Sequence, residues 1–322
     1  MSCLKRAALL LAGLCCLAVA QAQPYPSRTI TLVVPVPPGG FLDFMARVIS
    51  PPMSKTFGQP VVIDNKPGAS GNIASTIVAK AKPDGHTLLV GYSMFHTGNP
   101  TMFANLDWDP IRDFAPVAML STSPHIVAVH PTLPVTSLRE LVEYARANPG
   151  KVNYATPGNG SVAHVGVELF KQMTKIDLTH IPYKGSSIMM QDVLSGRVQM
   201  TVAAPTSVAQ HIQTGRLRGL AMAAKKRSPL LPNLPTSEEA GYKGFELEAW
   251  SAIFAPAGTP PDAVKRLSDT LGEILATEEA KQATANAGFE VRYMNSSQLD
   301  AVVRSDIKHW SQVIRSAGIT AN

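Results

Sequence analysis

Short β-branched runs alternate with longer amphipathic segments along most of the chain. The run TITLVV at 29–34 predicts a buried strand, and the segment 42–57 predicts the helix that follows it. The same pattern predicts strands at 61–64, 87–90, 117–120, 126–129, 152–155, 178–181, 198–202, 218–221, 247–254 and 289–293. It predicts helices at 72–81, 137–148, 163–173, 187–194, 205–213, 261–276, 278–287 and 298–316. Such alternation is typical of the α/β class, with parallel sheets covered by helices.

The grouping of the predicted strands indicates two lobes. A central block at roughly 125–225 is a complete β/α series by itself, and 322 residues suit two domains of roughly 100–200 residues each. We therefore expect residues 23–124 and 226–322 to form lobe 1 and residues 125–225 to form lobe 2. The hinge is expected near residues 122–126 and 222–228. Ligands of such folds bind at the carboxyl ends of strands, so the loops after strands are the candidate sites.

The first 22 residues differ in character from the rest. Lys5 and Arg6 precede an unbroken apolar run from Ala7 to Ala20, and Ala20-Gln21-Ala22 places small residues where a signal peptidase cleaves. The run is shorter than the ~20 residues that span a bilayer. We expect a signal peptide, residues 1–22, that is cleaved near Ala22. No later stretch is long and apolar enough to cross a membrane, so the mature protein is expected to be soluble in the periplasm.

All three cysteines, Cys3, Cys15 and Cys16, fall in this leader. Their absence from the rest of the chain excludes a disulfide scaffold, a zinc ribbon, an iron–sulfur protein and a cysteine nucleophile. A lipid anchor on Cys15 is the alternative to a cleaved signal, but Leu14 stands where a small residue is required.

The charge of the chain argues against nucleic acid as a partner. Charged residues make up 16% of the chain, against ~25% in typical domains. The net charge is +6, and Lys5 and Arg6 of the leader supply two of those charges. Lys225-Lys226-Arg227 is the only tight basic cluster and is interpreted as a solvated turn. Such diffuse charge does not favour nucleic-acid binding.

The loop between the first predicted strand and helix is the first candidate site. Its paired glycines let the backbone approach a ligand closely, and the helix N-terminus that follows suits a carboxylate. Asp43 is either a helix cap or a ligand contact, and Phe41 is either a half-buried loop residue or a wall against an apolar ligand. The candidate residues here are Pro38, Gly39, Gly40, Phe41, Leu42 and Asp43.

The second candidate loop follows the predicted strand at 152–155. Gly158, Gly160 and Ala163 match G-x-G-x-x-A, the dinucleotide fingerprint, but a lone match outside an N-terminal βαβ unit is a weak signal. A glycine loop at a helix N-terminus binds any small anion. Ser161 either caps the helix or offers its hydroxyl to the ligand, and His164 either contacts the ligand or packs in the structure. The candidate residues here are Asn159, Gly160, Ser161 and His164.

Three further strand ends supply the remaining candidates. Tyr183 is suited to stacking or hydrogen bonding and Lys184 to attracting an anion. The residues are Ser93 in the loop 93–97, Tyr183, Lys184 and Gly185 after the strand at 178–181, and Ala203 after the strand at 198–202.

Motifs of catalysis are missing from the sequence. It contains no G-x-S-x-G elbow and no H-E-x-x-H, and its eight histidines are dispersed, so we expect no enzyme, no metal site and no cofactor. Several strand-to-helix turns with amide donors but no nucleophile predict a binding cleft. A secreted hydrolase is the alternative, with Ser161 and His164 as its only nucleophile–base pair.

Many short motifs, in order along the whole mature chain, resemble the Bug family, the periplasmic receptors of tripartite tricarboxylate transporters. These motifs are YPSR (25–28), VVPVPPGG (33–40) with Asp43, FGQPVV (57–62), NKPGA (65–69), GNI (71–73), PDG (83–85) with TLL (87–89), DFAPV (113–117), NYA (153–155), GNGS (158–161), HIPYKG (180–185) and APAGTP (255–260).

The resemblance implies a two-lobed, type II-like periplasmic binding protein with its ligand cleft between the lobes. Such a receptor captures a small carboxylate by hinge closure and delivers it to a two-component inner-membrane permease; a receptor for a two-component sensor is the alternative. The carboxylate would be held by backbone and water in the loop 38–43, with help from the second lobe. A monomer is expected.

The sequence departs from the family pattern at two places. Phe41-Leu42 stands where small or hydroxylated residues are usual, and Ala203-Ala204 stands where an Asp-Asn pair is common. Both changes make the cleft less polar. The hypothesis that follows is an apolar or aromatic carboxylate ligand rather than an acidic amino acid, whose ammonium group needs an acceptor.

Overall fold

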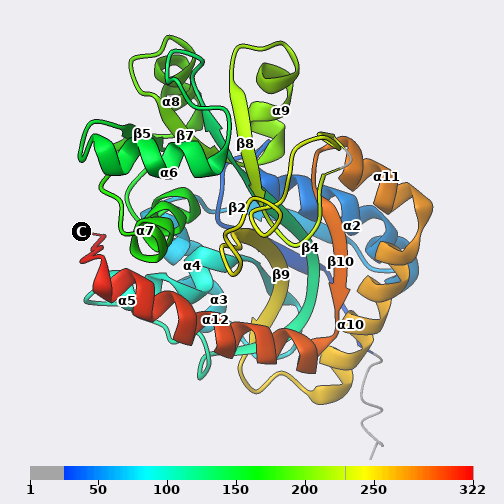
Figure 1. Ribbon diagram of the computed structural model, residues 1–322. Helices are drawn as coiled ribbons and strands as arrows, with labels where there is room; N and C mark the ends of the chain where they lie inside the picture. The colour runs from blue at the N-terminus through cyan, green and yellow to red at the C-terminus, as the bar shows by residue number, and fades with distance from the viewer. Residues whose placement is uncertain (1–24, 229, 322) are drawn as a thin grey trace, which may run out of the picture.

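The structure, a computed structural model, describes residues 25–228 and 230–321 (Figure 1). The predicted signal peptide and its cleavage site lie outside these residues. The strands are β1 (Ile30–Val34), β2 (Val61–Asn65), β3 (Thr87–Tyr92), β4 (Phe114–Val129), β5 (Asn153–Thr156), β6 (Thr179–Pro182), β7 (Met200–Ala203), β8 (Arg218–Ala223), β9 (Glu248–Pro256) and β10 (Glu290–Met294). The helices are α2 (Phe41–Phe57), α3 (Asn72–Ala79), α4 (Ser93–Thr97), α5 (Asn99–Met102), α6 (Leu138–Ala147), α7 (Val162–Thr174), α8 (Ser186–Leu194), α9 (Pro205–Gln213), α10 (Pro261–Ala276), α11 (Glu278–Asn286) and α12 (Ser296–Ser316), with a 3₁₀ turn at Ala69–Gly71.

The predicted helices and strands are all present within a few residues of their expected limits, with two corrections. The pieces expected at 117–120 and 126–129 are parts of one long strand, β4, and the loop expected at 93–97 is the short helix α4. Both errors concern segments whose pattern is interrupted or too short to show a period.

The sheet is mixed rather than parallel throughout. Its strand order is β2-β1-β3-β9-β4-β7-β5-β6, with β8 and β10 also paired to β4. The β1–β2, β1–β3, β5–β6 and β5–β7 pairs are parallel, as predicted. The pairs that involve β4 or β9 are antiparallel, which corrects the expectation of wholly parallel sheets. The reason is that β4 carries the chain from one group of strands to the other and β9 carries it back.

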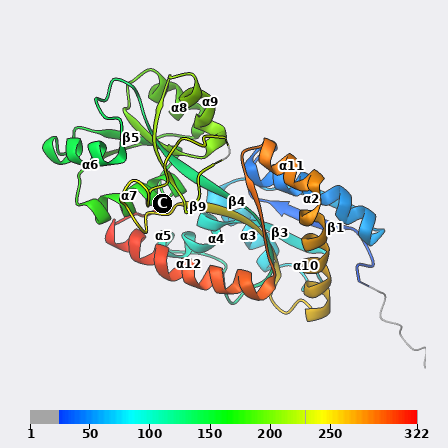
Figure 2. The same cartoon turned by 45° about the vertical axis from the view of Figure 1, so that its right-hand side comes forward.

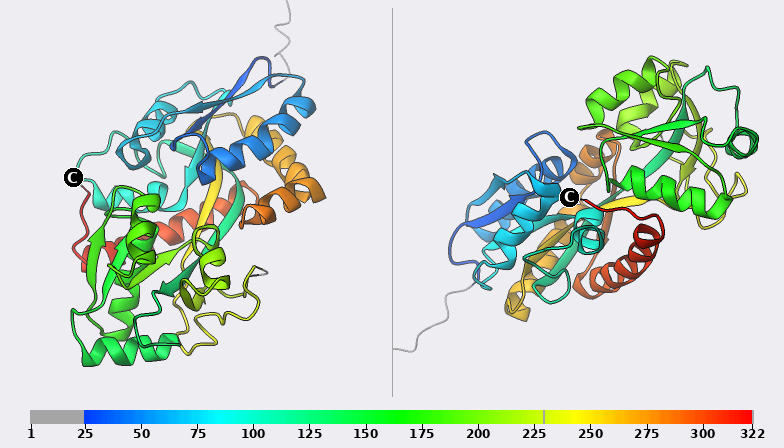
Figure 3. Two further views of the ribbon diagram at one scale, coloured as in Figure 1. Left: turned by 90° about the horizontal axis from the view of Figure 1, so that it is seen from above. Right: turned by 90° about the vertical axis from the view of Figure 1, so that its left-hand side faces the viewer.

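Strand β4 divides the molecule into two lobes, and this confirms the predicted two-lobed α/β fold. Residues 114–124 of β4 pair with β9, whereas residues 126–129 pair with β7. We call β1–β3, β9 and β10 with α2–α5, α10 and α11 the first lobe, and β5–β8 with α6–α9 the second lobe. Figure 2 separates the green elements of the second lobe from the blue and orange elements of the first. Figure 3 shows the same division from two other sides.

Strand β1 shows why the first lobe has helices on both faces of its sheet. Ile30, Leu32 and Val34 pack in one apolar cluster with α2, and Val33 packs in another with Ala74 of α3. Alternate residues of a strand point to opposite faces, so a continuous apolar run needs cover on both sides. Helix α2 covers one face of the sheet, and helix α3 covers the other.

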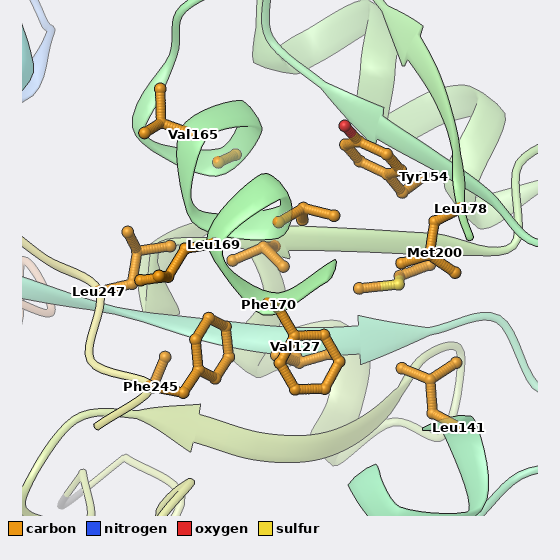
Figure 4. Packing of buried hydrophobic residues seen from close by; sticks show 14 of the residues in the cluster. Val127, Leu141, Tyr154, Val165, Leu169, Phe170, Leu178, Met200, Phe245 and Leu247 are labelled. Atoms are coloured by element: carbon orange, nitrogen blue, oxygen red, sulfur yellow. The ribbon is translucent and has the colours of Figure 1, made fainter. Parts of the chain in front are cut away.

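The core of the second lobe extends to the segment that leads into β9 (Figure 4). Phe170 of α7 packs on Phe245, with ring centroids 4.7 Å apart. Leu247 lies so close to α7 that a Cβ at Gly166 would be 2.2 Å from its Cδ2 atom. The chain therefore returns to the first lobe only after Leu247, where β9 begins.

Helix α12, red in Figure 1, runs beneath both lobes. It contacts α10 and β10 at one end and α7 at the other. Trp310 and Ile314 join the core cluster of the second lobe, and the amide of Ala321 donates to the carbonyl of Met102 (3.1 Å). Among the described residues, no helix is both long and apolar enough to cross a membrane.

Candidate ligand-binding cleft

A cavity of about 930 Å³ lies between the two lobes and is lined by residues of both. This volume is in the range of small-molecule sites. None of the described residues that line it is Asp, Glu, Lys or Arg. The part of the chain that the structure describes also holds no group of three His, Cys, Asp or Glu residues that could bind a metal.

Eight of the residues predicted from the sequence line this cavity: Gly39, Gly40, Phe41, Leu42, Asn159, Gly160, Ser161 and Ala203. Seven predicted residues do not line it: Pro38, Asp43, Ser93, His164, Tyr183, Lys184 and Gly185. The predicted loops thus meet at one cavity, and the residues outside its lining either support these loops or point elsewhere.

The N-termini of four helices meet at this cavity. The first residues of α2, α7 and α8 line it, and so do Ala204 and Thr206 at the start of α9. The N-cap residues of α8 and α9, Gly185 and Ala204, provide no side-chain hydrogen bond, and neither helix has an acidic residue in its first turn. Free N–H groups and the positive end of the helix dipole attract an anion at such positions.

Asp43 supports the first loop from behind. Its side chain is 1% exposed, and its oxygens accept hydrogen bonds from Gly39 N (2.9 Å), Arg47 Nε (2.8 Å) and Asn65 Nδ2 (3.0 Å). These donors, Arg47 first, lower the pKa of Asp43 to about 2. Neither interpretation from the sequence fits, because the N-cap of α2 is Gly40 and the carboxylate is already saturated by donors of the protein.

Five aromatic side chains, Phe41, Phe44, Tyr92, Phe95 and Phe289, line the side of the cavity that belongs to the first lobe; we call them the aromatic cluster. The ring centroid of Phe289 is 4.3 Å from that of Phe41 and 6.0 Å from that of Phe44. Tyr92 packs edge-on against Phe41 (6.3 Å) and Phe95 (5.1 Å). Phe41 is therefore a wall of the cavity and not merely a loop residue.

The second loop is held by His164. Its Nδ1 accepts the N–H of Gly160 (3.1 Å), and the hydroxyl of Ser161 accepts the backbone N–H of His164 (3.3 Å), so Ser161 caps α7. Burial lowers the pKa of His164 to about 4. The two side chains are not bonded to each other, so this geometry is that of a helix cap and not of an activated nucleophile.

Four other predicted residues that do not line the cavity are Tyr183, Lys184, Gly185 and Ser93. The Tyr183 hydroxyl donates to Asp192 (2.8 Å), and Lys184 is exposed. Gly185 is the N-cap of α8, and Ser93 is the first residue of α4. Burial, followed by the hydrogen bond to Asp192, raises the pKa of Tyr183 to about 12.

Three buried polar residues of the cavity wall are not among the residues predicted from the sequence. Asn99 lies on α5, and Ser123 and His125 lie on β4. All three are buried, and no described residue forms a hydrogen bond with Asn99 Oδ1, Ser123 Oγ or His125 Nδ1. The available signal was the presence of Ser and His in the otherwise apolar strand FAPVAMLSTSPHIVAV.

Comparisons with known proteins agree on one family. The family model for the tripartite tricarboxylate transporter family receptor matches residues 45–319. A Pseudomonas protein encoded in the tcbD–tcbE intergenic region is 36% identical over 299 residues, which cover 92% of this chain and 89% of that protein. BugT of Bordetella pertussis is 35% identical over 298 residues, which cover 92% of this chain and 91% of BugT.

Solved structures give the same result. A Rhodopseudomonas palustris protein with adipate has a TM-score of 0.80 and 37% identity, covering 92% of this chain and 99% of its own. MatC from the same species, with bound malate, has a TM-score of 0.76 and 34% identity, covering 90% of this chain and 100% of MatC. The chain thus belongs to the tripartite tricarboxylate transporter receptor family, the TctC or Bug family of periplasmic solute-binding receptors.

Proposed function

We propose that this receptor binds a small carboxylate whose body is aromatic or otherwise apolar. The observation that carries the proposal is the composition of the cavity. Four helix N-termini meet there, and none of the described residues that line it is Lys or Arg. An anion is then held by backbone N–H groups and helix dipoles, which suit one carboxylate group.

The aromatic cluster supports an apolar ligand body. Phe41 stands at the first position of α2, next to the amides of that helix terminus, and packs on Phe289 and Tyr92. Aromatic side chains bury large apolar areas and favour rings over charged groups. The two Rhodopseudomonas palustris relatives were solved with adipate and malate, which supports a carboxylate ligand. The aromatic body of the ligand is proposed from the aromatic cluster alone.

Closure of the two lobes on the ligand is part of the proposal. We keep the division predicted from the sequence, residues 23–124 and 226–322 as lobe 1 and residues 125–225 as lobe 2, with one change. Residues 226–247 pack with the second lobe and are assigned to it. The strand crossing at Pro124–His125 supports the hinge on the outward path. On the return path, the packing of Phe245 and Leu247 on α7 moves the proposed hinge to the start of β9. Contacts made only in the closed form would then stabilise it.

The proposed place of action is the periplasm, after cleavage near Ala22, with the protein acting as a monomer. There it would deliver its ligand to a two-component permease of the inner membrane. Because backbone amides rather than a catalytic pair supply the binding groups, no turnover of the ligand is expected.

Isothermal titration calorimetry of the mature chain tests the ligand class. We expect benzoate or a similar aromatic acid to bind more tightly than glutamate. Glutamate brings an ammonium group, and the described lining of the cavity offers it no acidic side chain. Tight binding of glutamate or aspartate, with no response to aromatic acids, would overturn the proposed body of the ligand.

A further inference from the structure

Three buried polar side chains on the cavity wall are incompletely hydrogen-bonded within the described part of the chain. Asn99 is 0% exposed, Ser123 2% and His125 7%, and each has one buried polar atom without a hydrogen bond. Buried polar groups of native proteins are nearly always paired, and those at a binding site are paired when the ligand is present. Three such atoms around one cavity point to a ligand group that forms hydrogen bonds.

The register of the sheet places Ser123 and His125 relative to Tyr92 of the aromatic cluster. Ser251 of β9 lies opposite Tyr92 of β3 on one side and opposite Ser121 of β4 on the other. Opposed residues of antiparallel strands share a face, and so do residues two apart on one strand, which brings Ser123 and His125 to the face that Tyr92 occupies. One strand separates β3 from β4, and Ser123 and His125 lie two and four residues beyond the level of Tyr92. Their backbone positions are therefore roughly 12 and 16 Å from that of Tyr92.

The amide of Asn99 fixes the kind of group that is bound. Its Nδ2 donates to the carbonyl of Ser70 and to Oδ1 of Asn72, both at 2.8 Å. Both partners are acceptors, so the free atom of the amide is its oxygen, which accepts only. The ligand must therefore present a donor here, and a second carboxylate would be repelled.

The donor on the ligand is uncharged. An ammonium group in this cavity would need an acidic side chain, and none of the described residues lining it is acidic. Burial lowers the pKa of His125 to about 4, so at neutral pH its imidazole both accepts and donates. The Ser123 hydroxyl has the same capacity. A ligand hydroxyl, which donates and accepts, matches all three side chains.

We propose that Asn99, Ser123 and His125 form a polar subsite that recognises a hydroxyl group on an aromatic carboxylate. The ring lies against the aromatic cluster and its hydroxyl reaches the polar subsite, so the ligand class is the hydroxylated aromatic acids. This inference rests on the proposed function, because the carboxylate and the ring are bound as described there.

Calorimetry with benzoate and its 2-, 3- and 4-hydroxy derivatives tests the polar subsite. The three isomers place the hydroxyl at different distances from the carboxylate. We expect one isomer to bind at least about tenfold more tightly than benzoate, because it pairs buried groups that benzoate leaves unpaired. Ser123→Ala should reduce this ratio severalfold.

Ser121→Ala is the matched control. Ser121 is buried on the same face of β4, but its hydroxyl is already bonded to Ser251 (2.7 Å), so its removal should leave the ratio unchanged. His125→Phe keeps a ring of similar size and should also reduce the ratio. Circular dichroism and thermal unfolding establish that each variant is folded.

The possible failures are distinguishable. Equal, measurable binding of benzoate and all three isomers overturns the polar subsite, whose groups then hold only water, and leaves the proposed function in place. Absence of binding by all four acids, with binding of adipate or glutamate, overturns the apolar ligand body and the polar subsite together.

Discussion

The imidazole rings of His164 and His180 stack with their centroids 3.8 Å apart and their planes 15° from parallel. His164 accepts the N–H of Gly160, and His180 Nε2 is hydrogen bonded to the Thr156 hydroxyl (2.7 Å). Burial lowers the pKa of each histidine to about 4. The glycine loop at the start of α7 therefore rests on two neutral imidazoles.

This pair predicts that the protein loses stability in mild acid. The unfolded histidines titrate near pH 6.5 and the folded ones near pH 4, so the unfolded state binds more protons between these values. The free energy of unfolding should fall as pH falls from about 6.5 to 4, by at most about 1.4 kcal/mol per pH unit for each buried histidine. Urea unfolding at a series of pH values measures it.

The variant His164→Asn isolates the contribution of the loop. The asparagine oxygen can still accept the N–H of Gly160, but the side chain does not titrate. The pH dependence should become shallower between pH 6.5 and 4. His180, His96 and His125, whose pKa values burial also lowers to about 4, keep part of it. Parallel curves for the variant and the wild type would contradict the prediction.

Asp43 gives a second prediction, for stability and binding together. Asp43→Asn removes the charge that holds Gly39, Asn65 and the Arg47 guanidinium, so the loop loses its support. Arg47 is more than half exposed, and solvent therefore screens the pair; we expect a loss of about 1–3 kcal/mol. Ligand affinity should fall as well, because Gly39 lines the cavity.

Asp300→Asn is the matched control for this change. Asp300 and Arg304 form an ion pair with the same i,i+4 spacing, but both side chains are substantially exposed. The loss there should stay below about 0.5 kcal/mol. The low pKa of Asp43, about 2, also predicts the direction of a pH effect. The stabilisation of the fold by the Asp43 carboxylate is present above the unfolded pKa of 3.8 and is lost as pH falls from 3.8 toward 2. Equal losses for the two variants would show that Asp43 is not a support of the loop.

The local pattern of the sequence predicted most elements because most depend on short-range signals. The limits of α9 and α10 agree with the predicted ranges, since each begins at a proline that suits the first helical position. The sequence predicts two short pieces in place of β4, because Pro116 hides the beginning of the strand and Pro124 interrupts its apolar pattern. Both prolines pair with β9, and the register shifts after Pro116, which only the partner strand reveals.

The candidate site likewise combines residues that a local sequence signal predicts with residues that only the tertiary structure reveals. The sequence predicts the glycine loops because a glycine-rich turn before a helix is a local signal. The sequence does not predict Phe289 as a site residue, since this side chain reaches Phe41 only through the packing of the loop after α11 against α2. Ser123 and His125 lie inside a strand, and only the tertiary structure shows that this part of β4 borders the cavity. His164, a predicted site residue, does not line the cavity; it supports the second loop by accepting the N–H of Gly160.

Phe41 gives a third prediction, for specificity. Phe41→Ala removes the ring that packs between Phe289 and Tyr92 at the cavity wall. Affinity for aromatic acids should fall about tenfold or more, since buried aromatic anchors dominate such contacts. Affinity for a short aliphatic acid such as malate should change little. Phe57→Leu, at the other end of α2 and outside the cavity, is the control and should leave both affinities unchanged. A uniform loss for every acid would indicate damage to the loop instead of loss of the wall.

Gly288 gives the fourth prediction, for closure. It follows α11 of the first lobe, and a Cβ placed on it would lie 2.7 Å from Cγ2 of Thr206, at the start of α9 in the second lobe. Gly288→Ala should therefore hold the lobes apart at this point and weaken ligand affinity by about tenfold, because the closed form carries the binding contacts. Calorimetry with the best ligand measures the affinity, and small-angle scattering with saturating ligand measures the closure.

Two further variants separate the contact between the lobes from backbone strain. Gly288 has a φ of +74°, so alanine is strained there whatever the space around it. Gly244→Ala carries the same strain at a φ of +84° with nothing within 4 Å of the added Cβ, and should lower stability without changing affinity. In the Gly288→Ala background, Thr206→Ser removes the methyl group that the new Cβ meets. Affinity should then recover while the loss of stability remains, because only the steric term has been relieved. Recovery of neither quantity would mean that strain, and not the contact between α9 and the first lobe, caused the defect.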